Sequence, residues 1–363
     1  MKKKIIFFMP SFEGGGVEKN IILIANYFIK KNPSISIITS SKHIKNKFNN
    51  KIKFISPISR LWDKYGRIPK YLICIFLLLK EYKKDKSFHV FCFQGNAVCL
   101  IFCKLLRIKI IVRPNSSPSG WSKNIIKKFL FSKILSLSDL IIVNSLKFKL
   151  EMKKKFNLNT KCIYNPLNIK EIKKLSKKKI KFKFFTNDHV NLISVGRLVY
   201  QKDHITLLKA INEIKYKIKI KLLIIGEGNQ KLNLISFIQQ NNLEKIVKIK
   251  DRTENPFPYI LKSEIMILSS KFEGLPNILL EALTLKKFII SSNCPTGPSE
   301  ILDSGKGGFL FKVGNFKNLG NKILTYKKQK AKCKKIKKFA VKRLERFDFE
   351  RNLLEYFNIF NKL

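Results

Sequence analysis

The first half of the chain alternates short apolar runs with longer stretches in which apolar and basic residues mix. The runs have the length of buried strands, and most of the stretches between them have the length and spacing of helices. This alternation predicts a parallel sheet with helices on both faces. The runs are residues 5–9, 34–39, 52–55, 90–93, 108–112 and 140–143.

A second series of the same kind begins at residue 192. Before it, residues 170–183 are dense in lysine and lack elements bounded by turns, which indicates a linker. A chain of 363 residues is long enough for two domains. We therefore predict an α/β protein with Rossmann-like domains at residues 1–170 and 189–345 and a linker at residues 171–188. The second series comprises residues 192–195, 220–225, 247–250, 265–268 and 288–291.

The segment SSKFEGLPNILLE, residues 269–281, carries two carboxylates beside a predicted helix start. Glu273 lies on the turn after a strand, and Glu281 lies one turn into the helix that begins at Asn277. Such a turn lets backbone pass close to a ligand, and the helix start offers N–H groups to an anion. A sugar nucleotide, with phosphates and hydroxyls, suits this site. The turn residues between are Gly274, Leu275 and Pro276.

Two further segments have the chemistry of phosphate binding. Gly196 and Arg197 end the strand at residues 192–195, and Lys202 follows. Two cations at the carboxyl edge of a sheet can neutralise a diphosphate, although a solvated face would explain any single lysine. Gly15 and Gly16 lie between a strand and a helix, which is the layout of a phosphate cradle, but glycines in such turns more often serve a tight backbone.

Six short motifs occur in the order typical of one family, and the chain resembles the retaining family 4 glycosyltransferases of GT-B fold, with their E-x7-E motif. The resemblance implies two Rossmann-like domains that face each other across a cleft, with the donor on the second domain and the acceptor on the first. It also implies that residues 346–363 form a helix that crosses back to the first domain. The motifs are VGRL, QK, IIGEG, NPFPYI, EGLPNILLEAL and CPTGPSEIL.

The resemblance also gives expectations for single residues. Gly15 and Gly16 would face the cleft, and the loop with Asp251 and Arg252 would lie beside the nucleotide base. Many family members carry a histidine near residue 113 that contacts the donor sugar. This sequence has none there, so Arg113 or Asn115 would take over the polar role.

The predicted reaction moves a hexose or N-acetylhexosamine from a nucleoside diphosphate sugar, with UDP-sugar favoured, to a hydroxyl of a glycan or lipid-linked acceptor with retention. Glu273, Arg197 and Lys202 are the expected catalytic residues, and Glu281 would bind the ribose. No D-x-D triplet occurs, so we expect no metal and no cofactor besides the sugar nucleotide. The alternatives are a sugar-nucleotide epimerase of the same fold and a basic nucleic-acid-binding protein.

Lys plus Arg total 74 against 24 acidic residues, a net charge of +50. Abundant Lys, Ile, Asn and Phe indicate an AT-rich coding bias as one source. No nucleic-acid-reading motif accompanies the lysines, so the remainder favours anionic lipid or phosphorylated substrates. Residues 60–84 hold an apolar core with basic flanks, typical either of a helix on a membrane surface or of a buried helix. Seven scattered cysteines without C-x-x-C indicate a reducing compartment. We therefore expect a cytoplasmic, peripheral protein on the inner face of the membrane.

Overall fold

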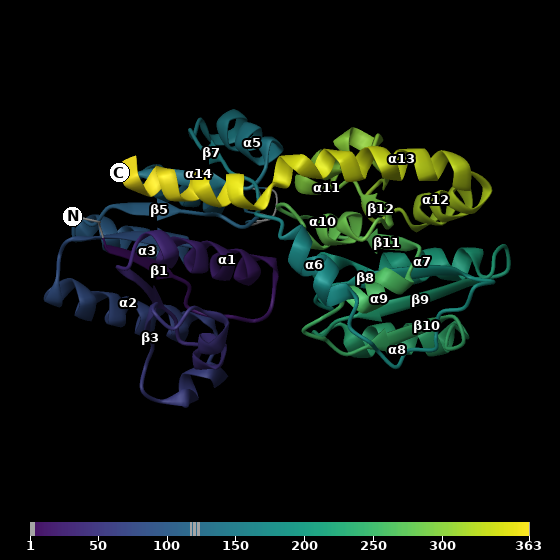
Figure 1. Cartoon of the computed structure of the whole chain (residues 1–363), viewed down its shortest axis with the longest axis horizontal. Helices are drawn as coiled ribbons and strands as arrows, with labels where there is room; N and C mark the ends of the chain where they lie inside the picture. The colour runs from purple at the N-terminus through teal and green to yellow at the C-terminus, as the bar shows by residue number, and fades with distance from the viewer. Residues whose placement is uncertain (1–3, 117, 119–120, 122–123, 363) are drawn as a thin grey trace. The chain divides into compact units, whose positions relative to one another are not determined.

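The computed structural model describes residues 4–116, 118, 121 and 124–362. The chain divides into two compact units (Figure 1). Unit 1 comprises Met1–Pro166 and Glu350–Leu363, and unit 2 comprises Leu167–Phe349. The chain therefore returns to unit 1 at its end.

The described residues of unit 1 form a parallel sheet of seven strands in the order β3-β2-β1-β4-β5-β6-β7. β1 lies at its centre, where Phe7 pairs in register with Ile37 on one side and Phe91 on the other. The predicted α/β class is confirmed. The strands are β1 Lys4–Phe8, β2 Ile35–Ile38, β3 Lys53–Ile55, β4 Phe88–Cys92, β5 Ile110–Val112, β6 Leu140–Val143 and β7 Lys161–Cys162.

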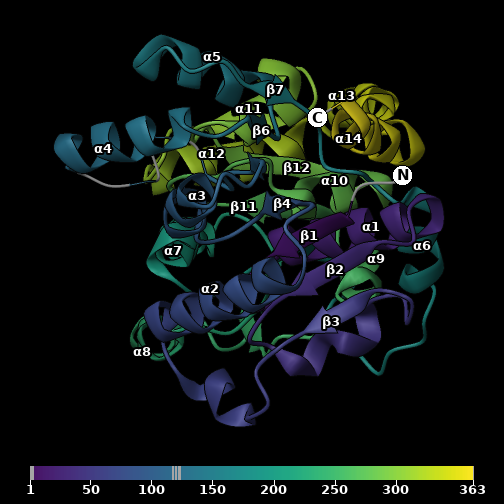
Figure 2. The same ribbon diagram turned by 90° about the vertical axis from the view of Figure 1, so that its left-hand side faces the viewer.

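Helices cover both faces of this sheet because alternate strand residues are apolar on both sides. Ile6 and Phe8 pack into a core with residues of α2, α3, α4 and α5. Phe7 points the other way and packs against Phe28 of α1. The helices are α1 Gly16–Lys31, α2 Arg67–Lys84, α3 Asn96–Leu105, α4 Ile125–Ser136, α5 Leu146–Phe156 and α14 Phe349–Lys362, with short 3-10 turns η1 Lys42–Lys47 and η2 Arg60–Lys64 (Figure 2).

Helix α14 is fixed to unit 1 by aromatic packing and by one buried cation. Phe28 contacts Phe360 edge-on at a centroid distance of 5.5 Å. The fully buried Arg113 donates from Nε to the hydroxyl of Tyr356 at 3.0 Å and from a second nitrogen to Asn165 Oδ1 at 2.6 Å. The Tyr356 hydroxyl in turn donates to the carbonyl of Ile163 at 3.3 Å. These bonds join the last helix to the end of β5 and to the segment after β7.

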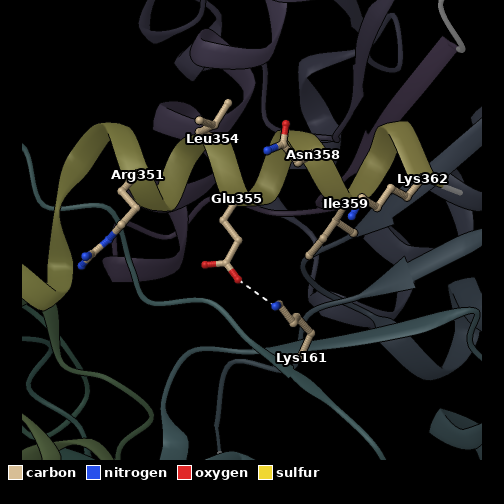
Figure 3. Close-up of a pocket in the computed structure, with 7 residues that line it drawn as sticks. All are labelled: Lys161, Arg351, Leu354, Glu355, Asn358, Ile359 and Lys362. Atoms are coloured by element: carbon tan, nitrogen blue, oxygen red, sulfur yellow. Dashed lines mark ion pairs between the residues drawn. The ribbon is translucent and has the colours of Figure 1, made fainter.

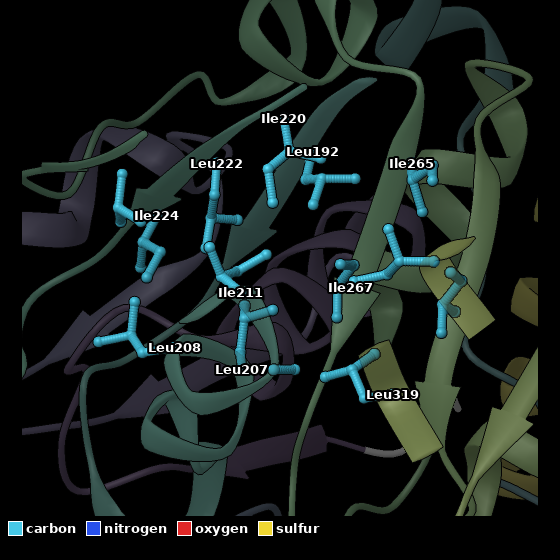
Figure 4. Packing of buried hydrophobic residues seen from close by; sticks show 14 of the residues in the cluster. Leu192, Leu207, Leu208, Ile211, Ile220, Leu222, Ile224, Ile265, Ile267 and Leu319 are labelled. Atoms are coloured by element: carbon cyan, nitrogen blue, oxygen red, sulfur yellow. The ribbon is translucent and has the colours of Figure 1, made fainter. Parts of the chain in front are cut away.

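Within its described residues, unit 2 has a parallel sheet of six strands in the order β10-β9-β8-β11-β12-β13. Its core lies between strand residues such as Leu192 and Ile265 and helix residues such as Leu207 and Ile211 (Figure 4). The strands are β8 Val190–Val195, β9 Ile220–Ile225, β10 Val247–Lys250, β11 Ile265–Leu268, β12 Phe288–Ser292 and β13 Phe309–Phe311. The helices are α6 Ile169–Ser176, α7 His204–Ile214, α8 Lys231–Gln240, α9 Phe257–Lys262, α10 Asn277–Thr284, α11 Gly297–Ile301, α12 Phe316–Lys328 and α13 Lys330–Lys342, with 3-10 turns η4 Tyr200–Lys202, η5 Asp303–Gly305 and η6 Arg343–Phe347.

The structure differs from the prediction at the expected linker, residues 171–188. Its first six residues complete helix α6, which Asn168 caps by accepting a hydrogen bond from the Glu171 N–H at 3.0 Å. Ile172 is buried on one face of this helix. The many lysines lie on its other faces, so the charge density hid an amphipathic helix. Residues 177–189, all described, contain neither helix nor strand.

We expect Tyr356→Phe to lower the free energy of unfolding of unit 1 by about 1–3 kcal/mol, because the Arg113 guanidinium would lose a buried acceptor. Urea unfolding of the full chain, followed by a probe in unit 1, measures the change. The matched control is Tyr216→Phe, since Tyr216 is 91% exposed and should give a change within about 0.5 kcal/mol. Equal stability of the two variants would contradict the role given to Arg113.

Candidate functional site

Two turns at the carboxyl edge of the unit 2 sheet lie backbone against backbone. Gly226 packs on the turn after β8, where a Cβ at position 226 would lie 1.9 Å from the carbonyl oxygen of Gly196. The Leu198 N–H donates to the Glu227 carbonyl at 2.7 Å. Only glycine permits this approach at position 226. The contact fixes the direction in which the chain leaves β8 toward Arg197 and Lys202.

Lys202 and Glu273, both predicted site residues, form an ion pair. Lys202 Nζ lies 2.5 Å from Glu273 Oε1, and the side chains are only 16% and 9% exposed. The same carboxylate oxygen accepts a hydrogen bond from the Ser270 hydroxyl at 2.7 Å. Buried charges need such partners, because removing them from water is costly. The sequence placed both residues at the site, and the structure brings them into direct contact.

Three hydrogen bonds hold the backbone beside this ion pair, and the two side chains that donate in them, Ser269 and Gln201, were not predicted as site residues. The Ser269 hydroxyl donates to the Lys202 carbonyl at 2.9 Å. The Gln201 side chain donates to the Phe272 carbonyl at 2.9 Å, and the Lys271 N–H donates to the Gln201 carbonyl at 2.8 Å. These bonds tie η4 to the turn after β11. The signal in the sequence was the pair of serines that ends the apolar run at residues 265–268.

The predicted turn Gly274, Leu275 and Pro276 is buried under the loop after β12. The Glu273 N–H donates to the Pro295 carbonyl at 2.7 Å, and a Cβ at Gly297 would lie 2.0 Å from the Gly274 carbonyl oxygen. Burial, together with the charge of Glu273, raises the pKa of the neighbouring Cys294 thiol to about 12, so this cysteine stays protonated. Helix α10 then begins at Asn277, and Pro276 at its N-cap has no side-chain acceptor to offer its first N–H groups.

The other predicted residues of unit 2 lie in different surroundings. Glu281 is 5% exposed, within α10. Arg197 is exposed after β8. Asp251 forms an ion pair with Lys231 at the start of α8, and the hydrogen bond and charge of that lysine lower the pKa of the carboxyl. Arg252 is exposed beside it.

In unit 1 the predicted glycine turn already holds a carboxylate. The Glu18 side chain accepts hydrogen bonds from the backbone N–H groups of Glu13 and Gly14. Gly14 has a positive φ of 83°, whereas Gly15 is extended and has open space where a Cβ would lie. Gly16 is the first residue of α1. These two N–H groups are thus bonded to a carboxylate of the same chain, and open space lies beside Gly15.

Arg113 corrects an expectation from the sequence. The prediction gave it or Asn115 the contact with sugar or acceptor, but Arg113 has no exposed surface. Its donors are used by Tyr356, Asn165 and Asn115 inside unit 1. The residue therefore serves packing. Asn115 accepts one of these bonds at 2.8 Å and is itself partly exposed.

A surface hollow on unit 1 lies between Lys161 of β7 and the outer side of α14 (Figure 3). Lys161 and Glu355 form an ion pair across it at 3.0 Å, and Arg351 and Lys362 lie further along the helix. None of the predicted site residues lines it. We assign the candidate site to the carboxyl edge of the unit 2 sheet instead. Among the described residues, no group of three or more His, Cys, Asp or Glu could hold a metal ion.

Comparison with known proteins identifies a family for part of the chain. Residues 176–343 match the family model for glycosyl transferases group 1. The chain carries a glycosyltransferase group 1 domain. Together with the named relatives, this match makes it an enzyme that transfers glycosyl groups, and an epimerase finds no support.

One relative of this glycosyltransferase is a Campylobacter jejuni enzyme, N-acetylgalactosamine-N,N'-diacetylbacillosaminyl-diphospho-undecaprenol 4-alpha-N-acetylgalactosaminyltransferase. It is 29% identical over 311 residues, which cover 80% of this chain and 82% of the relative. An uncharacterised glycosyltransferase of Methanocaldococcus jannaschii is 31% identical over 274 residues, covering 70% of this chain and 65% of that one. The crystal structure of Anabaena Alr3699/HepE with UDP-glucose has a TM-score of 0.80 at 17% identity and covers 100% of both chains. This last likeness concerns the fold, which is that of the GT-B glycosyltransferases.

We predict a pH-dependent stability of the glycosyltransferase from His204, at the start of α7. Burial, with the charge of Lys202 added, lowers the pKa of His204 from 6.5 to about 3. Between these values the unfolded chain binds the proton and the folded chain does not, so stability falls as the pH drops below 6.5.

The loss from this residue between pH 7.5 and pH 5 should be roughly 2 kcal/mol. His204→Gln should remove that part of the pH dependence, measured as the difference in unfolding free energy of unit 2 at the two pH values. His43→Gln is the control, since His43 is exposed in η1. An unchanged pH dependence in His204→Gln would show that His204 is not held neutral.

Proposed function

We propose that this enzyme transfers a hexose or N-acetylhexosamine from a nucleoside diphosphate sugar to a hydroxyl of a glycan or lipid-linked acceptor, with retention. The observation that carries the proposal is the buried pair of Lys202 and Glu273 beside the start of α10. A cation, a carboxylate and the start of a helix at one sheet edge suit a ligand with a diphosphate and hydroxyls. A uridine donor is supported by the likeness to a fold solved with UDP-glucose.

The leaving diphosphate gains negative charge as the bond to the sugar breaks. In the proposal Lys202, Arg197 and the first N–H groups of α10 stabilise that charge, as preorganised donors and cations do in other enzymes. Lys202 needs little reorganisation, because Glu273 and the carbonyl bond from Ser269 already hold it. Gly196 and the turn at residues 274–276 let the phosphates approach the backbone. No metal is required, since cations of the chain supply the positive charge.

Each carboxylate has a separate role in the proposal. Glu273 lies on the turn, where it holds Lys202 and can offset the positive charge that develops at the anomeric carbon. Glu281, on α10, accepts hydrogen bonds from the ribose hydroxyls. The loop with Asp251 and Arg252 lies beside the base, and Gly15, Gly16 and Asn115 of unit 1 serve the acceptor side.

A lipid-linked acceptor fits the name of the Campylobacter relative, which acts on a diphospho-undecaprenol glycan. The reaction would then belong to the biosynthesis of cell-surface polysaccharide, lipopolysaccharide or a related glycan, at the inner face of the cytoplasmic membrane. All seven cysteines, which lie in the described part of the chain, are free thiols, as is typical of reducing compartments. No helix of the described residues is long and apolar enough to cross a bilayer.

Arg197→Ala and Lys202→Ala should each lower kcat at least about tenfold, because each cation acts on a charge that grows in the transition state. UDP release from UDP-sugars, in the presence of a glycan acceptor, measures the rate. Lys209→Ala, at an exposed position of α7, is the control for loss of charge. If either site variant keeps a rate within about threefold of the wild type, the phosphate role is wrong.

Glu281→Gln should weaken donor binding about tenfold or more, because a charged acceptor of the ribose hydroxyls becomes neutral. Glu273→Gln should instead slow the chemical step and change donor affinity little. Donor titration and single-turnover rates on both variants separate the two effects, with melting curves to verify the fold. Normal donor affinity in Glu281→Gln would contradict its ribose contact, and a normal rate in Glu273→Gln would contradict its role at the sugar.

A further inference from the structure

Exposed apolar side chains are distributed very unevenly over this chain. Among the described residues, 22 large apolar side chains are exposed, and 16 of them lie between residues 58 and 150 of unit 1. Unit 2 contributes five, although it is of similar size. Isolated exposed apolar residues are ordinary, but a concentration on a few neighbouring helices marks an interaction surface.

Helix α2 shows how this surface arises. Ile68, Leu72 and Phe76 are spaced by four residues, so they share one side of the helix, and they are 73%, 63% and 50% exposed. Cys74 and Leu78 lie on the opposite side and are buried in the core of unit 1. Helix α2 therefore combines features of the two alternatives that the sequence left open. One side of it packs in the core of unit 1, and the other side exposes apolar residues.

Helix α4 has the same feature at its first two turns. Ile125, Ile126, Phe129 and Leu130 are all more than half exposed, whereas Leu135 near the other end is buried. Helix α3 lies between α2 and α4 and contacts both (Figure 2). The exposed residues of these helices thus belong to one layer on one face of the sheet.

The exposed apolar residues also gather at one end of that layer. In α4 and α5 they occupy the first half of the helix, and in α2 and α3 they extend from the first half to Phe76 and Ile101, just past the middle; Leu105 and Leu137 are exceptions at the opposite end. A helix that follows a strand starts at the strand's carboxyl end, so these first halves line the carboxyl edge of the unit 1 sheet. We call this surface the apolar edge. The glycine turn after β1 lies at the same edge of the sheet.

The segment that carries the apolar edge is rich in basic residues and poor in acids. Residues 58–150 hold 18 Lys and Arg but only four Asp and Glu. Of these acids, Glu81 and Asp139 are paired with lysines. Two lysines lie over exposed aromatic rings, Lys80 over Phe76 at 4.7 Å and Lys133 over Phe129 at 5.3 Å. Apolar side chains that insert and cations that stay at the headgroups suit an anionic bilayer.

We propose that the apolar edge of unit 1 docks on an anionic phospholipid bilayer and brings the carboxyl edge of the sheet to the membrane. A second copy of the chain is the weaker fit, because each copy carries a net charge of +50 and two basic surfaces repel each other. The inference rests on the proposed function in one respect, that a lipid-linked acceptor would meet the enzyme there. The lipid contact itself follows from side chains and charge.

The test is flotation of the full-length protein with vesicles of phosphatidylcholine alone and of phosphatidylcholine mixed with phosphatidylglycerol. The wild type should float with the mixed vesicles. The double variant Ile126→Ser, Phe129→Ser should bind them at least about tenfold more weakly, because it loses two inserting side chains. The control is Leu232→Ser, Tyr216→Ser, whose parent residues in unit 2 are 79% and 91% exposed. It should bind as the wild type does, and both variants should keep the wild-type melting temperature.

Three results would overturn the proposal. One is equal flotation of the wild type with neutral and mixed vesicles, and another is equal binding by the two double variants. The third is dimerisation that Ile126→Ser, Phe129→Ser abolishes, without lipid binding by the wild type, which would make a second copy the partner. UDP release with a water-soluble acceptor is measured on the same proteins. Flotation without transfer would overturn the proposed function alone, and transfer without flotation would overturn the docking surface alone.

Discussion

The candidate site depends on two places where a turn packs directly on a glycine, so closely that no side chain would fit there. The turn after β8 lies against Gly226, and the turn after β11 lies against Gly297, with a Cβ at either glycine falling within about 2 Å of a carbonyl oxygen. A larger residue would push one turn away from the other. The first of these contacts fixes the path toward Lys202, and the second fixes the turn that carries Glu273. Motifs that are far apart in the sequence thus pack against each other at one site.

At this site, the ion pair of Lys202 and Glu273 contributes more to the position of the two side chains than to the stability of the fold. A buried pair costs desolvation that its mutual attraction only partly returns, whereas removing one partner leaves an unpaired charge at a cost of about 3–5 kcal/mol. The additional bonds from Ser270 and Ser269 satisfy the carboxylate and fix the lysine backbone. A cation held in this way loses little freedom when a diphosphate arrives.

The sequence predicts the local elements well because apolar runs and turns are local signals. The prediction failed where an element was too short to show a pattern, or where two residues in contact lie far apart in the sequence. Strand β7 has only two residues, too few for a pattern, and the three-residue strand β13 was not predicted either. Arg113 looked like a ligand contact because it follows a strand, but its partner Tyr356 lies 243 residues further along the chain. Lys202 and Glu273 lie 71 residues apart, so no local sequence pattern could predict their contact. Only the resemblance to a family placed both at one site.

The positive charge of the chain indicates a binding surface only where exposed apolar residues accompany it. Helix α13 of unit 2 has seven lysines among 13 residues, yet Phe339 is its single exposed large apolar residue in the described structure. That is a solvated basic face, as a compositional bias alone would produce. In unit 1 the same excess of lysine surrounds helices that leave apolar side chains uncovered. A bias toward Lys, Ile and Phe can supply both kinds of residue, but it does not place the apolar ones at one edge of one sheet. The position of the apolar side chains, rather than the number of charges, therefore distinguishes a binding surface from a coding bias.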